Sequence, residues 1–217
     1  MNRIAYLAMH YQNENCHPDG KIPYGLEQDA LVWREQVLAA ARQLAAGLRA
    51  HQVPILHVRL ATQPGQDDVI CNAPIFSVFK ERGAWPTGSW GADFVEGLGA
   101  QPGDFDITHG RNSAFYGSRL EEHMARLRPD WLIVSGVSTA YAVETTVRDA
   151  ADIGYQVVVA HDACATFRRD FHEASLRAMS LLARVASVGE ILAALSSPEG
   201  LAGLPFELRE CRVDADP

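Results

Sequence analysis

The stretch of sequence that decides the fold is WLIVSGVSTAYAVETTVRDAADIGYQVVVA, residues 131–160. It opens with an apolar run, continues with Val143, Val147 and Ala150 at helical spacing, and closes with a second apolar run after Gly154. Glycine suits a helix C-terminus because it adopts left-handed backbone conformations. Continuously apolar strands are buried on both faces. The stretch therefore predicts a strand–helix–strand unit within a parallel sheet.

The same alternation of apolar runs and helical patterns continues on both sides of this stretch. Before it, the apolar runs 3–9 and 54–60 enclose a helical stripe from Val37 to Leu48. After it, a helical pattern at 176–182 leads to an apolar run at 184–188. Buried strands interleaved with helices predict a three-layer, doubly wound, Rossmann-like α/β fold with a mainly parallel six-stranded sheet.

The length of 217 residues fits one domain, which we predict over 1–195. The stretch 61–103 lacks both strand and helix patterns, and a loop of that length is usually functional. The segment 196–217 is polar and is interrupted by Pro198 and Gly203. We expect this C-terminal extension to lie on the surface or to contact another subunit of a homo-oligomer.

The composition excludes several classes of protein. With 47% hydrophobic and 21% charged residues, the chain is neither disordered nor fibrous. A net charge of −8 argues against nucleic acid as a partner. The four cysteines form no CxxC pair, and no apolar run is long enough for a signal peptide or a membrane span. We therefore expect a cytoplasmic protein with no membrane partner.

Polar residues follow several of the predicted strands. His10 comes directly after the first apolar run, His109 lies in the segment 105–115, and a helix is predicted to begin near Tyr141. In open parallel sheets, ligands bind at the carboxyl ends of the strands. Amides at a helix N-terminus at that edge can bind an oxyanion. The sequence thus predicts a small-molecule site at this edge.

These segments resemble the isochorismatase-like, or cysteine hydrolase, superfamily. Its signature is similar to residues 136–159, its first-strand motif to 9–22, and its central motif to 88–124. The helix after its fifth strand resembles residues 172–179. The resemblance implies hydrolysis of amides and imides of small molecules, or of an enol ether in one branch. It also implies a cis peptide bond between Val137 and Ser138.

The resemblance implies a catalytic Asp, Lys and Cys, and this chain departs from the family at all three positions. His10 occupies the position of the Asp, His109 that of the Lys, and Ala142 that of the nucleophilic Cys. The surrounding motif residues are retained, namely Gln12, Asn13, Arg111, Ser113, Phe115, Gly136, Val137 and Thr139. The chain is therefore identified as a divergent member that lacks the triad.

Alanine offers no lone pair, so no covalent intermediate can form at Ala142. Cys16 and Cys164 do not begin a helix after a buried strand, so we expect neither to replace the nucleophile. His10 and His109 remain as candidates for acid/base catalysis, because imidazole titrates near neutral pH. The alternative is that both are ordinary pocket-lining residues bonded to backbone.

The other candidate site residues bind rather than react. The backbone amides of Tyr141 and Ala142 match the family's oxyanion hole, and Gln12, Arg111 and Trp90 are candidates for substrate binding. The alternative for Trp90 is packing on the sheet or at a subunit contact.

Two acidic positions are expected to play no part in the chemistry. Asp149 is interpreted as part of a solvated helix face, and Asp162 as a residue that stabilises a loop. Some relatives bind a divalent metal through an Asp-x-His pattern after the second strand, which 57–68 lacks. The alternative is a metal held by His10, His109 and either His17 or His161, but without that pattern we expect no metal and no cofactor.

Two functional hypotheses follow. The first is a hydrolase that acts on a small polar or cyclic amide, imide, ester or enol ether by non-covalent histidine chemistry. The second is a pseudoenzyme that binds a small ligand or serves as a scaffold subunit. The resemblance also implies a homo-oligomer, a dimer or larger.

Overall fold

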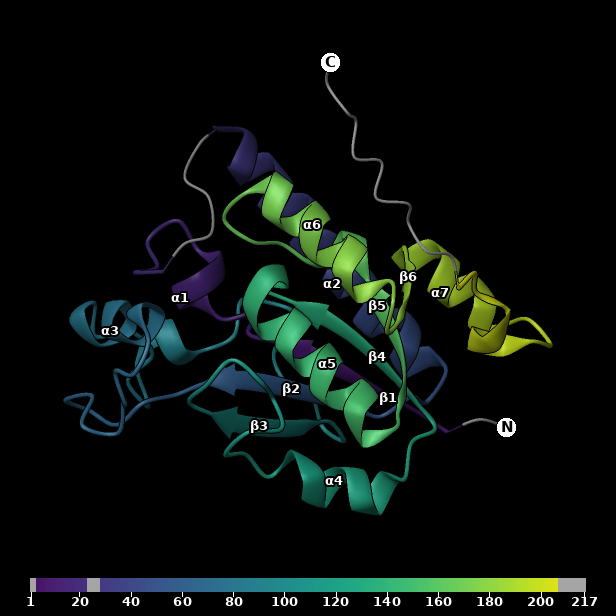
Figure 1. Ribbon diagram of the computed structural model, residues 1–217, viewed down its shortest axis with the longest axis horizontal. Coiled ribbons are helices and arrows are strands. Elements are labelled where there is room, and N and C mark those ends of the chain that lie inside the picture. The colour runs from purple at the N-terminus through teal and green to yellow at the C-terminus, as the bar shows by residue number, and fades with distance from the viewer. Residues whose placement is uncertain (1–2, 23–27, 207–217) are drawn as a thin grey trace.

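The computed structural model describes residues 3–22 and 28–206. Its centre is a sheet of six strands in the order β3-β2-β1-β4-β5-β6, and every neighbouring pair is parallel (Figure 1). This order is that of a doubly wound, Rossmann-like sheet, so the predicted fold class is confirmed. The strands are β1 (Ile4–Met9), β2 (Ile55–Leu60), β3 (Phe105–His109), β4 (Trp131–Gly136), β5 (Gln156–Ala160) and β6 (Arg184–Ala186).

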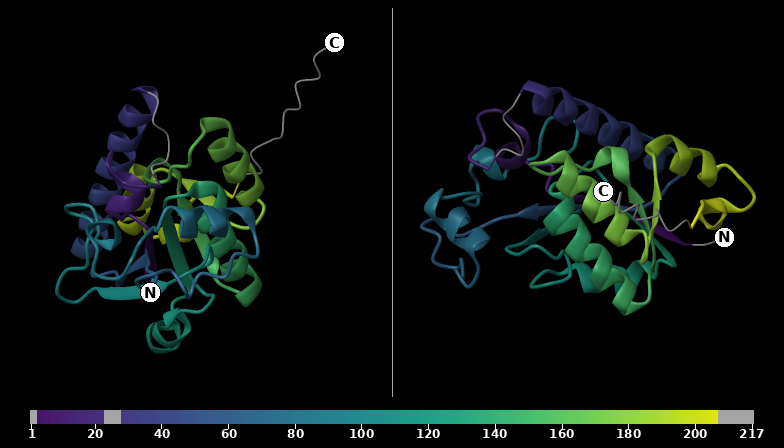
Figure 2. Two further views of the ribbon diagram at one scale, coloured as in Figure 1. Left: turned by 90° about the vertical axis from the view of Figure 1, so that its left-hand side faces the viewer. Right: turned by 45° about the horizontal axis from the view of Figure 1, so that its top comes forward.

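Helices cover both faces of the sheet (Figure 2). Side chains alternate along each strand: Tyr6 and Ala8 pack among the residues of α2 and α7, whereas Leu7 and Met9 pack among those of α4, α5 and α6. The two apolar layers explain why the strands are apolar without interruption. The helices are α1 (Asn13–Cys16), α2 (Gln28–Ala50), α3 (Pro74–Glu81), α4 (Leu120–Leu127), α5 (Glu144–Ile153), α6 (Arg169–Met179) and α7 (Val188–Leu195).

The segment 61–103 is more ordered than its sequence indicates. It contains α3 and a short 3-10 turn, η1 (Trp90–Ala92). Phe79 and Trp85 meet edge to face with their ring centroids 4.7 Å apart in a small separate core. The expectation of a wholly irregular stretch is wrong because Pro74 occupies the first turn of α3, where the missing N–H costs nothing.

Glycine ends both β4 and α5. Gly136 has φ 150°, and a Cβ there would collide with the carbonyl oxygen of Met9 on β1. The peptide bond between Val137 and Ser138 is cis, as the resemblance implied. Gly154 ends α5 with φ 107°, which confirms the predicted C-cap.

The residues that follow α7 still pack on the domain. Leu201 and Leu204 are buried in the same apolar cluster as α2 and α7. The rest of the predicted extension, 207–217, lies outside the described residues, so its role as an oligomer contact stays a prediction. Within the described part of the chain, no helix combines the length and apolar character that a membrane span needs.

Candidate active site

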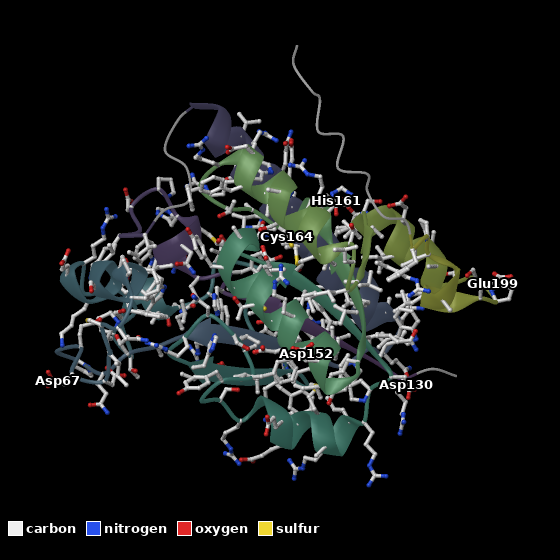
Figure 3. The ribbon with its side chains drawn as sticks, in the orientation of Figure 1. Asp67, Asp130, Asp152, His161, Cys164 and Glu199 are labelled. Carbon is white, nitrogen blue, oxygen red and sulfur yellow. The ribbon has the colours of Figure 1, made fainter. Side chains whose placement is uncertain are left out.

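The candidate site lies at the carboxyl edge of the sheet. His10 directly follows β1, His109 is the last residue of β3, and the chain leaves β4 towards α5 at the same edge. In Figure 3, Asp67, in the segment after β2, lies at the left of the molecule, and Asp130, directly before β4, lies towards the right. The parallel arrangement thus gathers the polar residues that follow the strands.

His10 and His109 contact each other directly. Their Nε2 atoms are 2.6 Å apart, although the two residues are separated by 99 positions in the sequence. The ring centroids lie 4.9 Å apart with a tilt of 36°. Only 2% of His10 and 3% of His109 is exposed. An imidazole–imidazole hydrogen bond therefore joins His10 and His109 inside the protein.

The neighbours of His109 assign its tautomer. Nδ1 of His109 lies 2.9 Å from the carbonyl oxygen of Ser113, which can only accept, so Nδ1 carries the hydrogen in the neutral ring. Nε2 of His109 then has a lone pair that faces Nε2 of His10. Because the His10 ring also makes a hydrogen bond with the backbone of Val137, the Ser113 contact assigns the proton of His109 alone.

The backbone of His10 adopts the left-handed conformation, with φ 56°. Its carbonyl oxygen accepts hydrogen bonds from the Gln12 amide at 2.7 Å and from Nδ2 of Asn15 at 2.9 Å. These contacts hold an unusual conformation that directs the imidazole away from the strand and towards His109.

Burial keeps both imidazoles neutral near pH 7. Burial lowers the pKa of His109 to about 4, against a smaller opposing effect of the Ser113 carbonyl. Burial also lowers the pKa of His10 well below its usual value; the nearby His109 adds to the fall, and a backbone hydrogen bond at Val137 opposes it. Both rings are therefore neutral at pH 7, and the lowered pKa also makes each a weaker base than an exposed imidazole.

A second layer of contacts, which sequence reasoning missed, holds His109 in place. Ser113 donates a side-chain hydrogen bond to Asp149 on α5, and the amide of Ala114 donates to Oγ1 of Thr146 at 3.0 Å. The interpretation of Asp149 as part of a solvated face is wrong, because α5 turns this carboxylate towards the 113–115 turn. The sequence signal for this contact was Ser113, a motif residue whose hydroxyl needs a hydrogen-bond acceptor.

Position 142 lies beside the start of α5. Ala142 is buried, within a single π-helical turn over Thr139–Val143. The amide of Tyr141 makes a long contact, 3.4 Å, with the carbonyl of Ser138, and its ring stacks on Phe167. A methyl group at Ala142 cannot act as nucleophile, so this position offers no covalent route.

The structure gives two predicted substrate-binding side chains other partners. Gln12 is fully buried; its Nε2 donates to the carbonyls of Leu60 and Ala92, both at 2.8 Å, and its Oε1 accepts from the Leu60 amide. Arg111 donates to the carbonyl of Ile70 and to Asn72, with its guanidinium 3.6 Å from the ring centre of Phe76. Gln12 therefore joins β2 to η1 and is not free to bind a substrate through its amide.

Trp90 is 49% exposed and meets His17 edge to face, with the ring centroids 4.9 Å apart. Its carbonyl accepts from Nδ2 of Asn13 at 2.9 Å. Among the predicted binding side chains, Trp90 retains a large exposed ring surface. Asp162 accepts from the Val188 amide at 2.8 Å, which fits its expected role in stabilising a loop.

The buried cysteines are poorly suited to act as nucleophiles. Burial raises the pKa of both Cys16 and Cys164 to about 12, so both are neutral thiols near pH 7. Cys71 is exposed in the segment before α3, and Cys211 lies outside the described residues. Among residues 3–22 and 28–206, no three His, Cys, Asp or Glu side chains gather as metal ligands would.

Comparison with known proteins assigns this arrangement to a family. A family model described as the isochorismatase domain matches residues 5–190. The uncharacterized isochorismatase family protein YecD of Escherichia coli O157:H7 is 32% identical over 162 residues, which is 74% of this chain and 84% of that protein. Ureidoacrylate amidohydrolase RutB of Pantoea ananatis is 34% identical over 76 residues, 35% of this chain and 30% of that protein.

The fold is also shared with solved structures. The isochorismatase family protein from Desulfovibrio vulgaris has a TM-score of 0.79 and 23% identity, covering 91% of this chain and all (100%) of that one. At that identity the likeness shows the fold alone. The family model, which spans most of the sequence, shows more: the chain belongs to the isochorismatase family.

Proposed function

We propose that this protein is a hydrolase of a small polar or cyclic substrate, an amide, imide, ester or enol ether, and that His10 and His109 are its acid/base pair. The observation that carries the proposal is the contact of 2.6 Å between their Nε2 atoms. Paired imidazoles can take up a proton at one step and return it at the next. The name of the amidohydrolase relative supports a substrate with an acyl group bound to nitrogen.

For an amide, the chemistry needs no covalent intermediate. Nε2 of His109 accepts a proton from water as the water oxygen forms a bond with the carbonyl carbon. The hydrogen bond between the two imidazoles opens to admit the water, and amides at Tyr141 and Ala142 stabilise the oxyanion. The C–N bond then breaks while the imidazolium returns the proton to the leaving nitrogen, so the pair ends as it began.

The pseudoenzyme remains the second candidate because a specific observation favours it. Both imidazoles are almost completely buried and use their Nε2 atoms on each other. Gln12, a retained motif residue, is committed to backbone contacts. A site of this kind can retain the family's fold and bind a ligand or another subunit without catalysing a reaction.

A substrate panel separates the two candidates. We expect the wild type to hydrolyse at least one member of a panel of small amides, imides, esters and enol ethers. His10→Ala and His109→Ala should each lower turnover by roughly 100-fold or more, the usual contribution of a positioned acid or base. The matched control is His51→Ala, which removes an exposed imidazole just after α2, at the opposite edge.

Product formation that survives both active-site substitutions would refute the acid/base role. Saturable binding by calorimetry, without product from any panel member, would instead support the pseudoenzyme. Circular dichroism of each variant distinguishes a lost reaction from a lost fold.

A further inference from the structure

Arg34, on α2, has a buried guanidinium for which the described residues provide no hydrogen-bond or ion-pair partner. Only 6% of the residue is exposed, and neither Nε nor Nη1 has a hydrogen-bond partner. A buried charge without a counter-charge is costly, and arginine does not escape the cost by losing its proton. Within the described residues, Arg34 therefore lacks the anion that its position requires.

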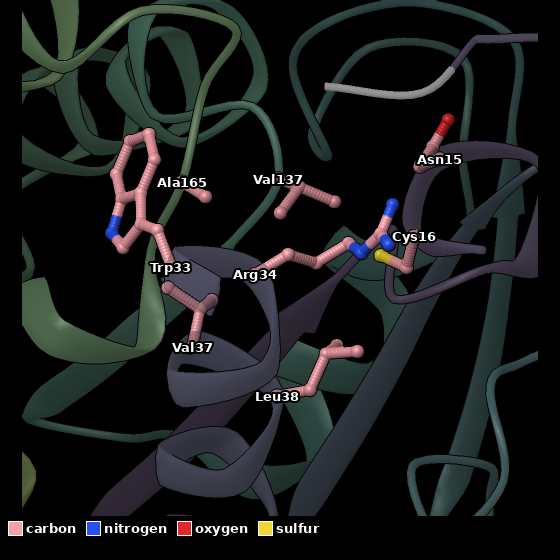
Figure 4. A pocket seen from close by; sticks show the side chains of 8 residues that line it. All are labelled: Asn15, Cys16, Trp33, Arg34, Val37, Leu38, Val137 and Ala165. Atoms are coloured by element: carbon pink, nitrogen blue, oxygen red, sulfur yellow. The ribbon is translucent and has the colours of Figure 1, made fainter. Parts of the chain in front are cut away.

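A small cavity lies beside this guanidinium. Its volume is about 10 Å³, which corresponds to roughly one water-sized atom. Figure 4 shows Arg34 reaching from α2 to lie next to Cys16, with Asn15 and Val137 on the same rim. Oδ1 of Asn15 is buried there and also unpartnered.

The cavity wall supplies no negative charge. None of its lining residues is acidic, and burial raises the pKa of the Cys16 thiol to about 12, so this group is neutral as well. The missing anion must therefore come from outside the described residues. The size of the cavity limits it to a single oxygen atom of an oxyanion, with the remainder of the molecule outside.

The cavity adjoins the paired imidazoles from the α2 side of the sheet. Asn15 on its rim donates to the carbonyl of His10 at 2.9 Å, and Val137 makes the backbone hydrogen bond that opposes the fall of the His10 pKa. Asn15 and Val137 thus separate a ligand at Arg34 from His10. We infer that Arg34 and the adjoining cavity form a binding site for a carboxylate, either a small free acid or the carboxylate group of the substrate.

The test uses formate, with formamide as an uncharged molecule of nearly the same size. The thermal midpoint is measured in a cationic amine buffer, with the ionic strength held constant by chloride, because neither the amine nor chloride offers an anionic oxygen to the cavity. Formate at ten times its Kd should raise the midpoint of the wild type by about 3 °C, and formamide should not.

Three variants test whether the formate shift of the thermal midpoint arises at Arg34. Arg34→Met should abolish the formate shift, and Arg34→Lys should keep part of it. Arg42→Met is the matched control, since Arg42 lies two turns along α2 and donates to the Glu96 carbonyl at 3.0 Å; its formate shift should equal that of the wild type. Without formate, Arg34→Met should unfold at or above the wild-type temperature, because it removes an unpaired buried charge.

An equal formate shift in Arg34→Met, an equal shift with formamide, or a marked loss of stability in Arg34→Met without formate would each overturn the inference. The thermal assay needs no turnover, so its failure is separate from failure of the acid/base pair. With a substrate in hand, KM distinguishes the two sources. If Arg34→Met raises KM for carboxylate-bearing substrates alone, the site binds the substrate; an unchanged KM with a retained formate shift in the wild type indicates a free acid.

Discussion

The carbonyl oxygen of Ser113 and the imidazole of His10 together decide what His109 can do. The carbonyl fixes the hydrogen on Nδ1, and His10 faces the remaining lone pair. Burial then lowers the pKa of His109 to about 4. An exposed histidine in the same motif would be largely neutral at pH 7 as well, but it would become charged near pH 6.5.

The lowered pKa predicts how stability depends on pH. The neutral ring is favoured in the folded state, so the unfolded chain binds more protons between about pH 6.5 and the folded pKa of about 4. Stability is therefore present above pH 6.5 and is lost as the pH falls. Protonation of His109 in the unfolded chain should by itself lower the free energy of unfolding by about 2 kcal/mol between pH 7 and pH 5.

Urea unfolding at the two pH values measures this loss. His109→Asn, which keeps a donor near the Ser113 carbonyl, should reduce the pH-dependent part, whereas His51→Ala should leave it nearly unchanged. The same loss in His109→Asn as in the wild type would contradict the assignment of the titrating group.

At the scale of an element, α5 connects the fold to the site. It begins beside the candidate oxyanion-binding amides, and its Asp149 and Thr146 hold the turn that orients His109. Its end at Gly154 sets its length and returns the chain to β5. A helix that is fixed at both ends positions the 113–115 turn more firmly than a loop can.

The end of α5 gives a prediction about stability. Nothing lies within 4 Å of a Cβ placed on Gly154, so Gly154→Ala carries only the backbone cost of φ 107°. We expect a loss of about 1 kcal/mol or slightly more in the free energy of unfolding by urea. Gly189→Ala in α7 is the control, because its Cβ also meets nothing and it lies in ordinary helix. It should be neutral or slightly stabilising, and an equal loss in both variants would contradict the explanation.

At the scale of the whole molecule, a charged cluster joins the layers at the edge opposite the site. Asp104, directly before β3, accepts from Arg49 of α2 at 2.5 Å and lies 3.0 Å from Nε2 of the fully buried His57 on β2. Burial raises the pKa of Asp104, but the hydrogen bonds from Arg49, Gln101 and His57 outweigh it, so the pKa is lowered overall. One carboxylate thus connects a helix and two strands.

Asp104→Asn should therefore destabilise the fold by about 3 kcal/mol, because Arg49 loses its counter-charge in a mostly buried position. Asp106→Asn provides the comparison two residues along β3, where Asp106 pairs with Arg59 and both side chains are about one third exposed, at 35% and 29%. That loss should stay below about 1 kcal/mol. Urea unfolding at pH 7 measures both, and a smaller effect at Asp104 than at Asp106 would contradict the cluster's role.

The sequence by itself determined the parallel α/β fold, because apolar periodicity is local and uninterrupted apolar strands must be covered on both faces. It also predicts that His10, His109 and Ala142 occupy the three catalytic positions of the family, because motif spacing is read along the chain. Only the tertiary structure decided that the two imidazoles touch, since that depends on strand order and on the left-handed backbone of His10. The sequence also could not show that Gln12 bridges β2 and η1 or that Arg34 lacks a partner among the described residues. A polar side chain takes its partners from the segments that the fold places beside it, and these are distant in the sequence.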